Sequence, residues 1–403
     1  MNLQRFGFCA GLALLATSLS ATAQDSAERG ATLARDLLLV DTHIDLPYRL
    51  FDHWEDATQP TAKGEFDYPR AVAGGLDVAF MSIYTPAELE ATGGNFQRAN
   101  LLIDMVEALV ARAPGRFEIV STPADALRVR KAGRIALAMG MENGSPLQGD
   151  LSRVQYFRDR GVSYITLAHG LANHLSDSSY DEKRPNGGLS EFGRAVVAEM
   201  NRVGVMVDIS HVSDEAFWQT LELSRAPVIA SHSSARHFTP GFERNMSDEM
   251  IKALAARGGV IMINFGSTFV TAEANAWQTA HSAARKAWLA EHGYVAEGPE
   301  ATQFSKDYTV GHPFPYSSVD DVAAHILHVV RIAGIDHVGL GSDFDGVGDS
   351  LPDALKDVSA YPNLVAALLK SGMSEQDLAK VLGENLMRVW GQAVAMGEGQ
   401  ERQ

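Results

Sequence analysis

Short apolar runs alternate with longer amphipathic stretches along most of the chain. The apolar runs are only a few residues long and lack a polar face, which is typical of fully buried strands. The stretches between them carry apolar residues at spacings of three and four, as in Asn100–Ala113, which predicts helices. Eight main strands are predicted, at Leu37–Thr42, Val78–Ile83, Ile135–Met141, Val162–Ala168, Val205–Ile209, Pro227–Ala230, Val260–Asn264 and Val338–Gly341.

Strands that alternate with amphipathic helices predict an α/β fold, a (β/α)₈ TIM-like barrel. The alternative is a doubly wound open sheet, but no predicted strand is followed by a Gly-rich dinucleotide loop. A short extra strand is expected at Phe117–Val120, and residues 48–70 are expected to be irregular. A long insertion, 271–316, follows the seventh strand; it is Ala-rich and partly helical, then irregular. We interpret it as a lid or as the subunit contact of a homodimer.

Residues 1–23 are predicted to be a signal peptide. Arg5 precedes the apolar segment Phe6–Leu19, and Ala21-Thr22-Ala23 fits a cleavage site. The alternative is an anchor helix, but the apolar segment is short for a membrane span. We therefore expect an exported protein, periplasmic or secreted, cleaved near Ala23. Residues 24–403 would form a single catalytic domain.

Composition narrows the classes of partner and ligand. The 403 residues are 46% apolar and 21% charged, which is ordinary for a globular protein. The net charge is −16 without a basic block, which argues against nucleic acid or an anionic membrane surface as partner. The single cysteine, Cys9, lies in the predicted signal peptide. A metal in the mature protein would therefore be bound by His, Asp and Glu.

Metal-binding residue types gather where the predicted strands end. The carboxyl ends of barrel strands carry the catalytic residues of this fold. Each residue alone has an ordinary structural explanation, yet chance placement of the whole group is improbable. The group consists of His43, Asp45, Glu142, His169, His211, His232 and Asp343. Strand two ends in Ser82 and Tyr84 and strand seven in Asn264, where we see no obvious ligand.

This set of nitrogen and oxygen donors suits two divalent ions that share a carboxylate. His43 and Asp45 stand two positions apart on a strand and so project to one face. Glu142 is the best bridge, because its strand lies between the two ligand groups around the barrel. Zinc fits such ligands, while manganese and cobalt remain open. A bridging water would have its pKa lowered toward about 7, giving a hydroxide nucleophile.

Five motifs together resemble the membrane (renal-type) dipeptidase family, zinc metallopeptidases on the amidohydrolase-like barrel. The similarity runs in order from about Leu38 to Trp390. The motifs are Asp41–Pro47, Met141–Gly144, Val207–Ser213, Ala226–Ala235 and Gly341–Gly346. The resemblance implies that His43 and Asp45 bind one zinc, that His211 and His232 bind the other, and that Glu142 bridges the two ions.

The resemblance also implies roles toward substrate. His169 would contact the scissile carbonyl and stabilise the oxyanion, and Arg244 would bind the terminal carboxylate of the dipeptide. Asp343 would be the acid/base, so that Asp343, Glu142 and His169 are the expected catalytic residues. Tyr48 matches a position at the pocket wall often held by Trp. Gly266 stands where mammalian members have a tyrosine, so we expect a wider pocket there.

The sequence therefore predicts an exported zinc dipeptidase that hydrolyses dipeptides and tolerates a D-residue at the C-terminal position. One alternative is another amidohydrolase acting on lactones or amides. Those enzymes usually carry His-x-His on strand one and often a carboxylated lysine on strand four. Here the chain has His43-x-Asp45 and His169. A non-catalytic peptide-binding relative is a second alternative, which the intact ligand set disfavours. The C-terminus lacks a lipid-anchor signal, so no stable membrane anchor is expected.

Overall fold

The computed structural model describes residues 26–296 and 298–401. The predicted signal peptide, 1–23, lies outside the described residues. Among the described residues, no helix combines the length and the apolar composition needed to cross a membrane.

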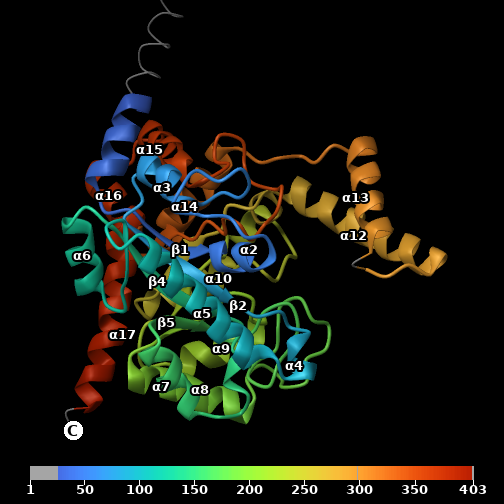
Figure 1. Cartoon of the computed structure of the whole chain (residues 1–403), viewed down its shortest axis with the longest axis horizontal. Coiled ribbons are helices and arrows are strands. Elements are labelled where there is room, and N and C mark those ends of the chain that lie inside the picture. The colour runs from blue at the N-terminus through green and yellow to red at the C-terminus, as the bar shows by residue number, and fades with distance from the viewer. Residues whose placement is uncertain (1–25, 297, 402–403) are drawn as a thin grey trace, which may run out of the picture.

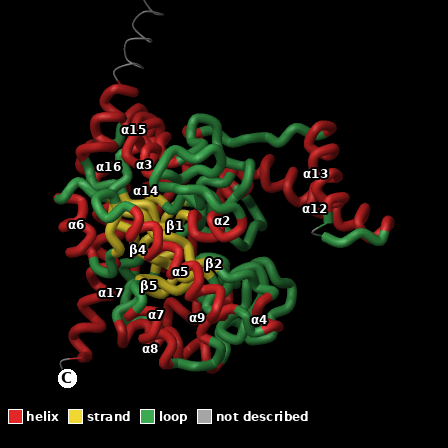
Figure 2. The backbone as a smooth tube through the Cα atoms, in the orientation of Figure 1, coloured by secondary structure: helices red, strands yellow, loops and turns green. Residues whose placement is uncertain are grey.

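A parallel barrel of eight strands forms the centre of the molecule, as predicted (Figure 2). Neighbouring strands pair in parallel throughout, with registers such as Val78 opposite Ala136. The ring closes between the end of the first strand and the residues that follow the last one, where Ile44 and Phe344 form a parallel bridge. At this bridge Asp45 N–H donates to Phe344 O at 2.8 Å. In order around the ring, the strands are β1 (Val40–Ile44), β2 (Val78–Tyr84), β4 (Ile135–Glu142), β5 (Val162–Thr166), β6 (Met206–Asp208), β7 (Ile229–Ala230), β8 (Val260–Ile263) and β9 (Val338–Leu340).

The predicted extra strand is also present. It is β3 (Phe117–Ile119), which pairs with the first residues of β4 outside the ring. The strand residues are buried throughout the barrel, apart from a half-buried Tyr84 at the end of β2. This explains their uninterrupted apolar character, since helices cover the outside of a parallel sheet.

Helices surround the barrel and begin at the polar caps that the sequence contains. Ser190 Oγ accepts the N–H of Gly193, and Ser213 and Ser247 cap in the same way. The surrounding helices are α2 (Leu46–Asp52), α3 (Tyr68–Gly74), α4 (Leu89–Thr92), α5 (Asn95–Arg112), α6 (Pro123–Lys131), α7 (Ser152–Asp159), α8 (Glu191–Val203), α9 (Asp214–Leu223), α10 (Asp248–Ala256), α14 (Val319–Ala333), α15 (Tyr361–Lys370), α16 (Glu375–Ala379) and α17 (Asn385–Glu401).

The last helix covers one end of the barrel. Trp390 of α17 is fully buried, and its ring lies 5.1 Å from that of Phe80 inside the barrel. The same buried cluster contains Val40, Val78 and Val260, which are the first residues of their strands. The end at which the strands begin is therefore filled with apolar side chains, which leaves the opposite end for polar residues.

Residues 48–70 are more ordered than predicted, because α2 and α3 lie in or beside them. Each of these helices has a proline in its first turn, and the Asp67 side chain caps α3. A proline and a capping side chain specify where these helices begin, although neither helix shows the regular spacing of apolar residues by which helices are predicted.

The insertion after the seventh barrel strand is a helical hairpin that projects from the barrel (Figure 1). The short helix α11 (Ser267–Val270) leads into α12 (Ala272–His292), and α13 (Pro299–Gly311) returns. Aromatic side chains hold the two long helices together: Trp277 lies 5.5 Å from Tyr308, and Trp288 lies 5.2 Å from Phe304. The segment is thus more helical than predicted.

Candidate metal centre and active site

Five predicted ligands meet at the end of the barrel where the strands finish. Glu142 lies between two groups: its Oε2 is 3.3 Å from His43 Nε2, and its Oε1 is 3.1 Å from His211 Nε2 and 3.3 Å from His232 Nε2. Asp45 completes the first group, with Oδ2 3.4 Å from His43 Nε2. One oxygen of Glu142 therefore faces His43 and the other faces His211 and His232, as in a bridging carboxylate.

The donor atoms fit cations. His43 Nε2 and Asp45 Oδ2 are buried, and neither has a hydrogen-bond partner among the described residues. The Nε2 atoms of His211 and His232 lie only 2.8 Å apart. Buried polar atoms without partners are costly, and a divalent ion at each group would satisfy them with the nitrogen and oxygen ligands that zinc accepts.

Neighbouring hydroxyls determine which nitrogen of each histidine is free. Tyr164 OH donates to Thr42 O at 3.0 Å, so it accepts from His43 Nδ1 at 2.8 Å. Ring Nδ1 of His43 then carries the proton, and Nε2 has its lone pair available for a metal.

His232 is oriented through a serine and a buried carboxylate. Ser231 Oγ donates to Asp208 Oδ2 at 2.6 Å and accepts from His232 Nδ1 at 2.8 Å. Asp208 Oδ2 also accepts from Thr166 Oγ1 at 2.5 Å, across the β5–β6 pair. Asp208 thus ties neighbouring strands together and holds one candidate ligand in its orientation.

Two residues of β2 belong to the site although sequence reasoning found no ligand there. Ser82 Oγ donates to Glu142 Oε2 at 3.1 Å. The Tyr84 ring lies 4.7 Å from the ring of His169 and 4.9 Å from that of Tyr48, so Tyr48 reaches the site through Tyr84. The available signal was the spacing of two between Ser82 and Tyr84 at a strand end, the same spacing as His43 and Asp45.

His169 stands beside the second ligand group. Its Nε2 is 3.5 Å from Glu142 Oε1, and its ring lies 4.2 Å from that of His211. Burial lowers the pKa of His169 from its usual value, which favours the neutral imidazole. A neutral ring so placed can donate one N–H to a substrate carbonyl oxygen.

Asp343 lies beside the first ligand group. One of its oxygens is within 4.8 Å of donor atoms of both His43 and Asp45. Its Oδ2 accepts from Asn264 Nδ2 at 2.7 Å, and burial raises its pKa to about 7. Asp343 and His211 both have positive φ, 65° and 67°, and strained backbone of this kind gathers at functional sites.

Arg244 is buried at the edge of the same centre. Its Nη1 donates to Ser233 Oγ and its Nη2 donates to His232 O, each at 2.7 Å. The same Nη2 lies 3.1 Å from His211 Nε2. The side chain is only 3% exposed, and its Nε has no partner among the described residues. Arg244 is therefore a fixed cation beside the ligands, not a solvated loop arginine.

Neighbouring side chains lie close to Gly266, and the expectation of a wider pocket there stays a prediction. A Cβ on Gly266 would lie 2.9 Å from Val347 Cγ1 and 3.0 Å from Cδ2 of Phe269. The ring of Phe269, one helical turn further along α11, fills the space where a side chain at position 266 would start. Sequence reasoning did not include Phe269, because contact between positions 266 and 269 depends on where α11 begins.

A second group of metal-binding residue types lies outside this centre. His237, Asp248 and His328 have donor atoms within 4.8 Å of one another. However, Arg331 donates to His328 Nδ1 at 2.6 Å, and His328 Nε2 lies 2.7 Å from Asp248 Oδ1. Both nitrogens of His328 are therefore already in use, and this group is an ion-pair network.

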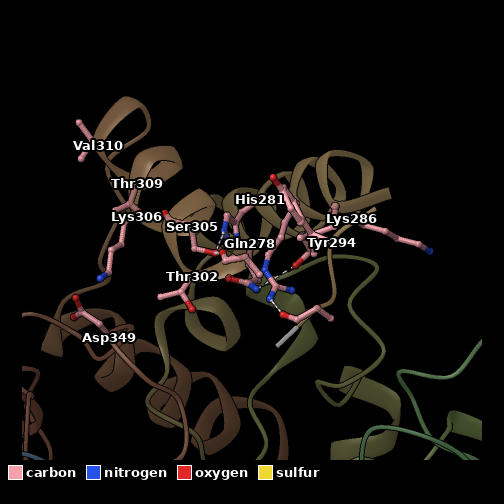
Figure 3. A pocket seen from close by; sticks show the side chains of 15 residues that line it. Gln278, His281, Lys286, Tyr294, Thr302, Ser305, Lys306, Thr309, Val310 and Asp349 are labelled. Atoms are coloured by element: carbon pink, nitrogen blue, oxygen red, sulfur yellow. Dashed lines mark hydrogen bonds between the residues drawn. The ribbon is translucent and has the colours of Figure 1, made fainter. Parts of the chain in front are cut away.

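A cleft of about 1190 Å³ lies in the insertion, between α12 and α13 (Figure 3). His281 and Ser305 face each other in it, with Nε2 3.1 Å from Oγ. Lys306 and Asp349 also line it. None of its lining residues is a candidate site residue, so the cleft is separate from the chemistry at the barrel.

The profile of "Membrane dipeptidase (Peptidase family M19)" matches residues 27–403. "Dipeptidase tcpJ" of Claviceps purpurea is 34% identical over 83% of this chain and 71% of its own length. "Uncharacterized dipeptidase C965.12" of Schizosaccharomyces pombe is 30% identical over 90% of this chain and 82% of its own.

Solved structures share the fold. The probable dipeptidase PvdM from Pseudomonas aeruginosa has a TM-score of 0.80 at 26% identity, covering 93% of this chain and 99% of that chain. A metallo peptidase from Rhodobacter sphaeroides, liganded with a phosphinate mimic of the dipeptide L-Ala-D-Ala, has a TM-score of 0.72 at 24% identity. The alignment covers 89% of this chain and 99% of that one.

Proposed function

The chain belongs to the membrane dipeptidase family, peptidase family M19, and is a metallo-dipeptidase of that family; we propose that it hydrolyses dipeptides at a centre of two zinc ions bridged by Glu142. The observation that supports two ions is the placement of Glu142. One of its oxygens faces His43 and the other faces His211 and His232. Asp45 would complete the first set of ligands.

When bound, the two ions would polarise the scissile carbonyl and lower the pKa of the attacking water. His169 would donate an N–H to the carbonyl oxygen as negative charge develops there. Asp343 would take the proton of the attacking water and deliver it to the leaving nitrogen. Its Oδ1 suits this transfer, because Oδ2 already accepts from Asn264.

Arg244 would hold the terminal carboxylate of the substrate through its guanidinium. The acidic ligands Asp45 and Asp343 would attract the free amine at the other end. Gripping both termini limits the substrate to two residues. We extend the proposal to dipeptides with a D-residue at the C-terminal position, because Tyr180, near Arg244, is 45% exposed and leaves the pocket open on that side.

We also propose that the protein is exported and cleaved near Ala23. The pattern that supports this is a positive residue, an apolar segment and a small-residue cleavage site within residues 1–23. N-terminal sequencing of the protein from the periplasmic fraction or the medium should begin shortly after Ala23. A mature protein that retains Met1 would contradict cleavage.

The proposed centre is tested by metal analysis together with a panel of L,L and L,D dipeptides and a lactone. We expect about two zinc ions per chain, hydrolysis of dipeptides and none of the lactone. Glu142→Gln should lower the metal content and abolish turnover, because a neutral amide bridges two cations poorly. His292→Ala, an exposed histidine of the hairpin, is the matched control and should behave as wild type. Dipeptide hydrolysis without bound metal would overturn the proposal.

A further inference from the structure

The rings of Phe269, Phe242 and Tyr180, here called the aromatic row, follow one another in space beside Arg244. The Phe269 ring lies 5.4 Å from the guanidinium carbon of Arg244 and 5.8 Å from the ring of Phe242. The ring of Phe242 lies 6.1 Å from that of Tyr180, which in turn lies 5.9 Å from the ring of His211. The aromatic row therefore extends from Arg244 to the second group of candidate metal ligands.

The aromatic row is accessible, although it borders a buried centre. Phe242 and Phe269 are half-buried and Tyr180 is 45% exposed. None of the three belongs to the buried hydrophobic core. Apolar rings around a few fixed polar groups are the usual lining of a small-molecule pocket, so the aromatic row has the composition of a substrate subsite.

Polar contacts hold the two loops and the short helix α11 that carry the aromatic row. Asn245, next to Arg244, donates through Nδ2 to Phe269 O at 2.8 Å. Arg184 pairs with Glu243 at 2.7 Å and so ties the loop of Tyr180 to the loop of Phe242. These contacts hold the backbone segments that carry the rings close to Arg244, as a preorganised binding surface requires.

Gly266 makes room for this arrangement. A Cβ at position 266 would lie 2.9 Å from Val347 Cγ1 and 3.0 Å from Cδ2 of Phe269. A larger side chain at 266 would therefore require these side chains to shift, whereas glycine leaves the ring of Phe269 in its present place beside Arg244.

We propose that Tyr180, Phe242 and Phe269 bind the side chain of the substrate's C-terminal residue and so select dipeptides ending in a large apolar residue. This rests on the proposed function, in which Arg244 binds the terminal carboxylate. The side chain and the carboxylate of that residue share one Cα, so the side chain must lie close to the guanidinium. The ring of Phe269 lies 5.4 Å from the guanidinium carbon of Arg244, close enough to contact that side chain. Because Tyr180 at the other end of the row is 45% exposed, the row would select apolar side chains more strongly than it selects the L over the D configuration.

The test compares kcat/KM for L-Ala-L-Phe and L-Ala-Gly, which differ only in the side chain at issue. Wild type should prefer L-Ala-L-Phe. Phe269→Ala should lower kcat/KM for L-Ala-L-Phe about tenfold, the size expected when an apolar pocket loses several methylene equivalents. The value for L-Ala-Gly should change less than about twofold, because glycine does not reach the ring. Phe269→Leu should restore much of the preference.

The ratio of the two kcat/KM values separates selectivity from general damage to the fold. Tyr180→Ala gives an independent variant at an exposed position, in case Phe269→Ala does not fold. Tyr156→Ala, a 39% exposed ring on α7, is the matched control and should leave the ratio unchanged. Equal loss on both peptides, or an unchanged ratio in Phe269→Ala and Tyr180→Ala, would overturn the aromatic subsite while leaving the dipeptidase proposal intact. If the metal-loaded wild type hydrolysed neither peptide, both the aromatic subsite and the dipeptidase proposal would be overturned.

Discussion

At the scale of single residues, several side chains of the candidate centre have two polar atoms, one of which already makes a hydrogen bond to a neighbouring residue. Tyr164 occupies one nitrogen of His43, and Ser231 occupies one nitrogen of His232. Asn264 occupies one oxygen of Asp343. Each contact leaves a single donor or acceptor atom facing the centre, which removes the choice of tautomer or rotamer from the ligands.

Asp343→Asn tests the proposed acid/base. An amide cannot accept a proton, so kcat should fall by about 10²–10⁴-fold while the metal content stays near that of the wild type. Steady-state kinetics and metal analysis on the same preparation check both parts. Turnover near the wild-type value would remove Asp343 from the proposed mechanism, and loss of metal would reassign it as a ligand.

Spatial crowding around Asp343 also explains a glycine in the same turn. A Cβ on Gly346 would lie 2.2 Å from Asp343 Oδ1 and 2.3 Å from Asp45 Oδ2. The motif Asp343–Gly346 therefore needs its glycine because two carboxylates occupy the space of a side chain.

At the scale of elements, the barrel and the hairpin are built differently. The barrel strands are buried almost throughout, whereas in α12 only Ala274 and Leu289 are buried. The hairpin is held mainly by its own rings, with Trp277 Nε1 donating to His312 O at 2.8 Å and its ring 5.0 Å from Phe314. Local contacts of this kind make a unit that can open without unfolding the barrel.

Trp277→Ala should loosen the hairpin selectively. Removal of the ring takes away its contacts with Tyr308 and Phe314, so protease cleavage within residues 272–311 should become faster. Dipeptide turnover should stay within about twofold, because no candidate site residue lies in the hairpin. Limited proteolysis followed by mass spectrometry locates the cuts. A large loss of kcat would instead indicate that the hairpin takes part in catalysis.

At the scale of the whole molecule, a half-buried pair of carboxylates, Glu65 and Asp345, joins the loop before α3 to the turn after β9. Glu65 N–H donates to Asp345 Oδ1 at 2.6 Å, and Asp345 N–H donates to the Glu65 carboxylate. Arg49 Nε lies 3.1 Å from Asp345 Oδ2. Burial, together with the charge of Asp345, raises the pKa of Glu65 to about 8.

This pKa predicts how stability depends on pH. Between pH 4.5, the usual pKa of Glu65, and about 8, the folded protein keeps a proton that the unfolded chain has lost. The titration of Glu65 therefore lowers the free energy of unfolding as the pH rises across that window. Glu65→Gln cannot titrate and retains a carbonyl oxygen for Asp345 N–H. Its Tm relative to wild type should rise steadily from pH 5 to pH 8, measured by thermal unfolding; a constant difference would contradict the prediction.

Much of the fold follows from the sequence because burial on both faces leaves uninterrupted apolar strands that are easy to recognise. The boundaries were less predictable. The strand predicted at Pro227–Ala230 is reduced to Ile229–Ala230, and α2 and α3 went unpredicted because caps and prolines, not an apolar period, define them.

The sequence by itself determined the barrel, the family and the identity of the residues at the strand ends, since strand direction alone brings those ends together. Only the tertiary structure decided how they are arranged. It placed one oxygen of Glu142 toward each ligand group, brought Ser82 and Tyr84 into the site, and filled the space beside Gly266 with Phe269. These contacts depend on rotamers and on loop geometry, which short-range sequence patterns do not encode.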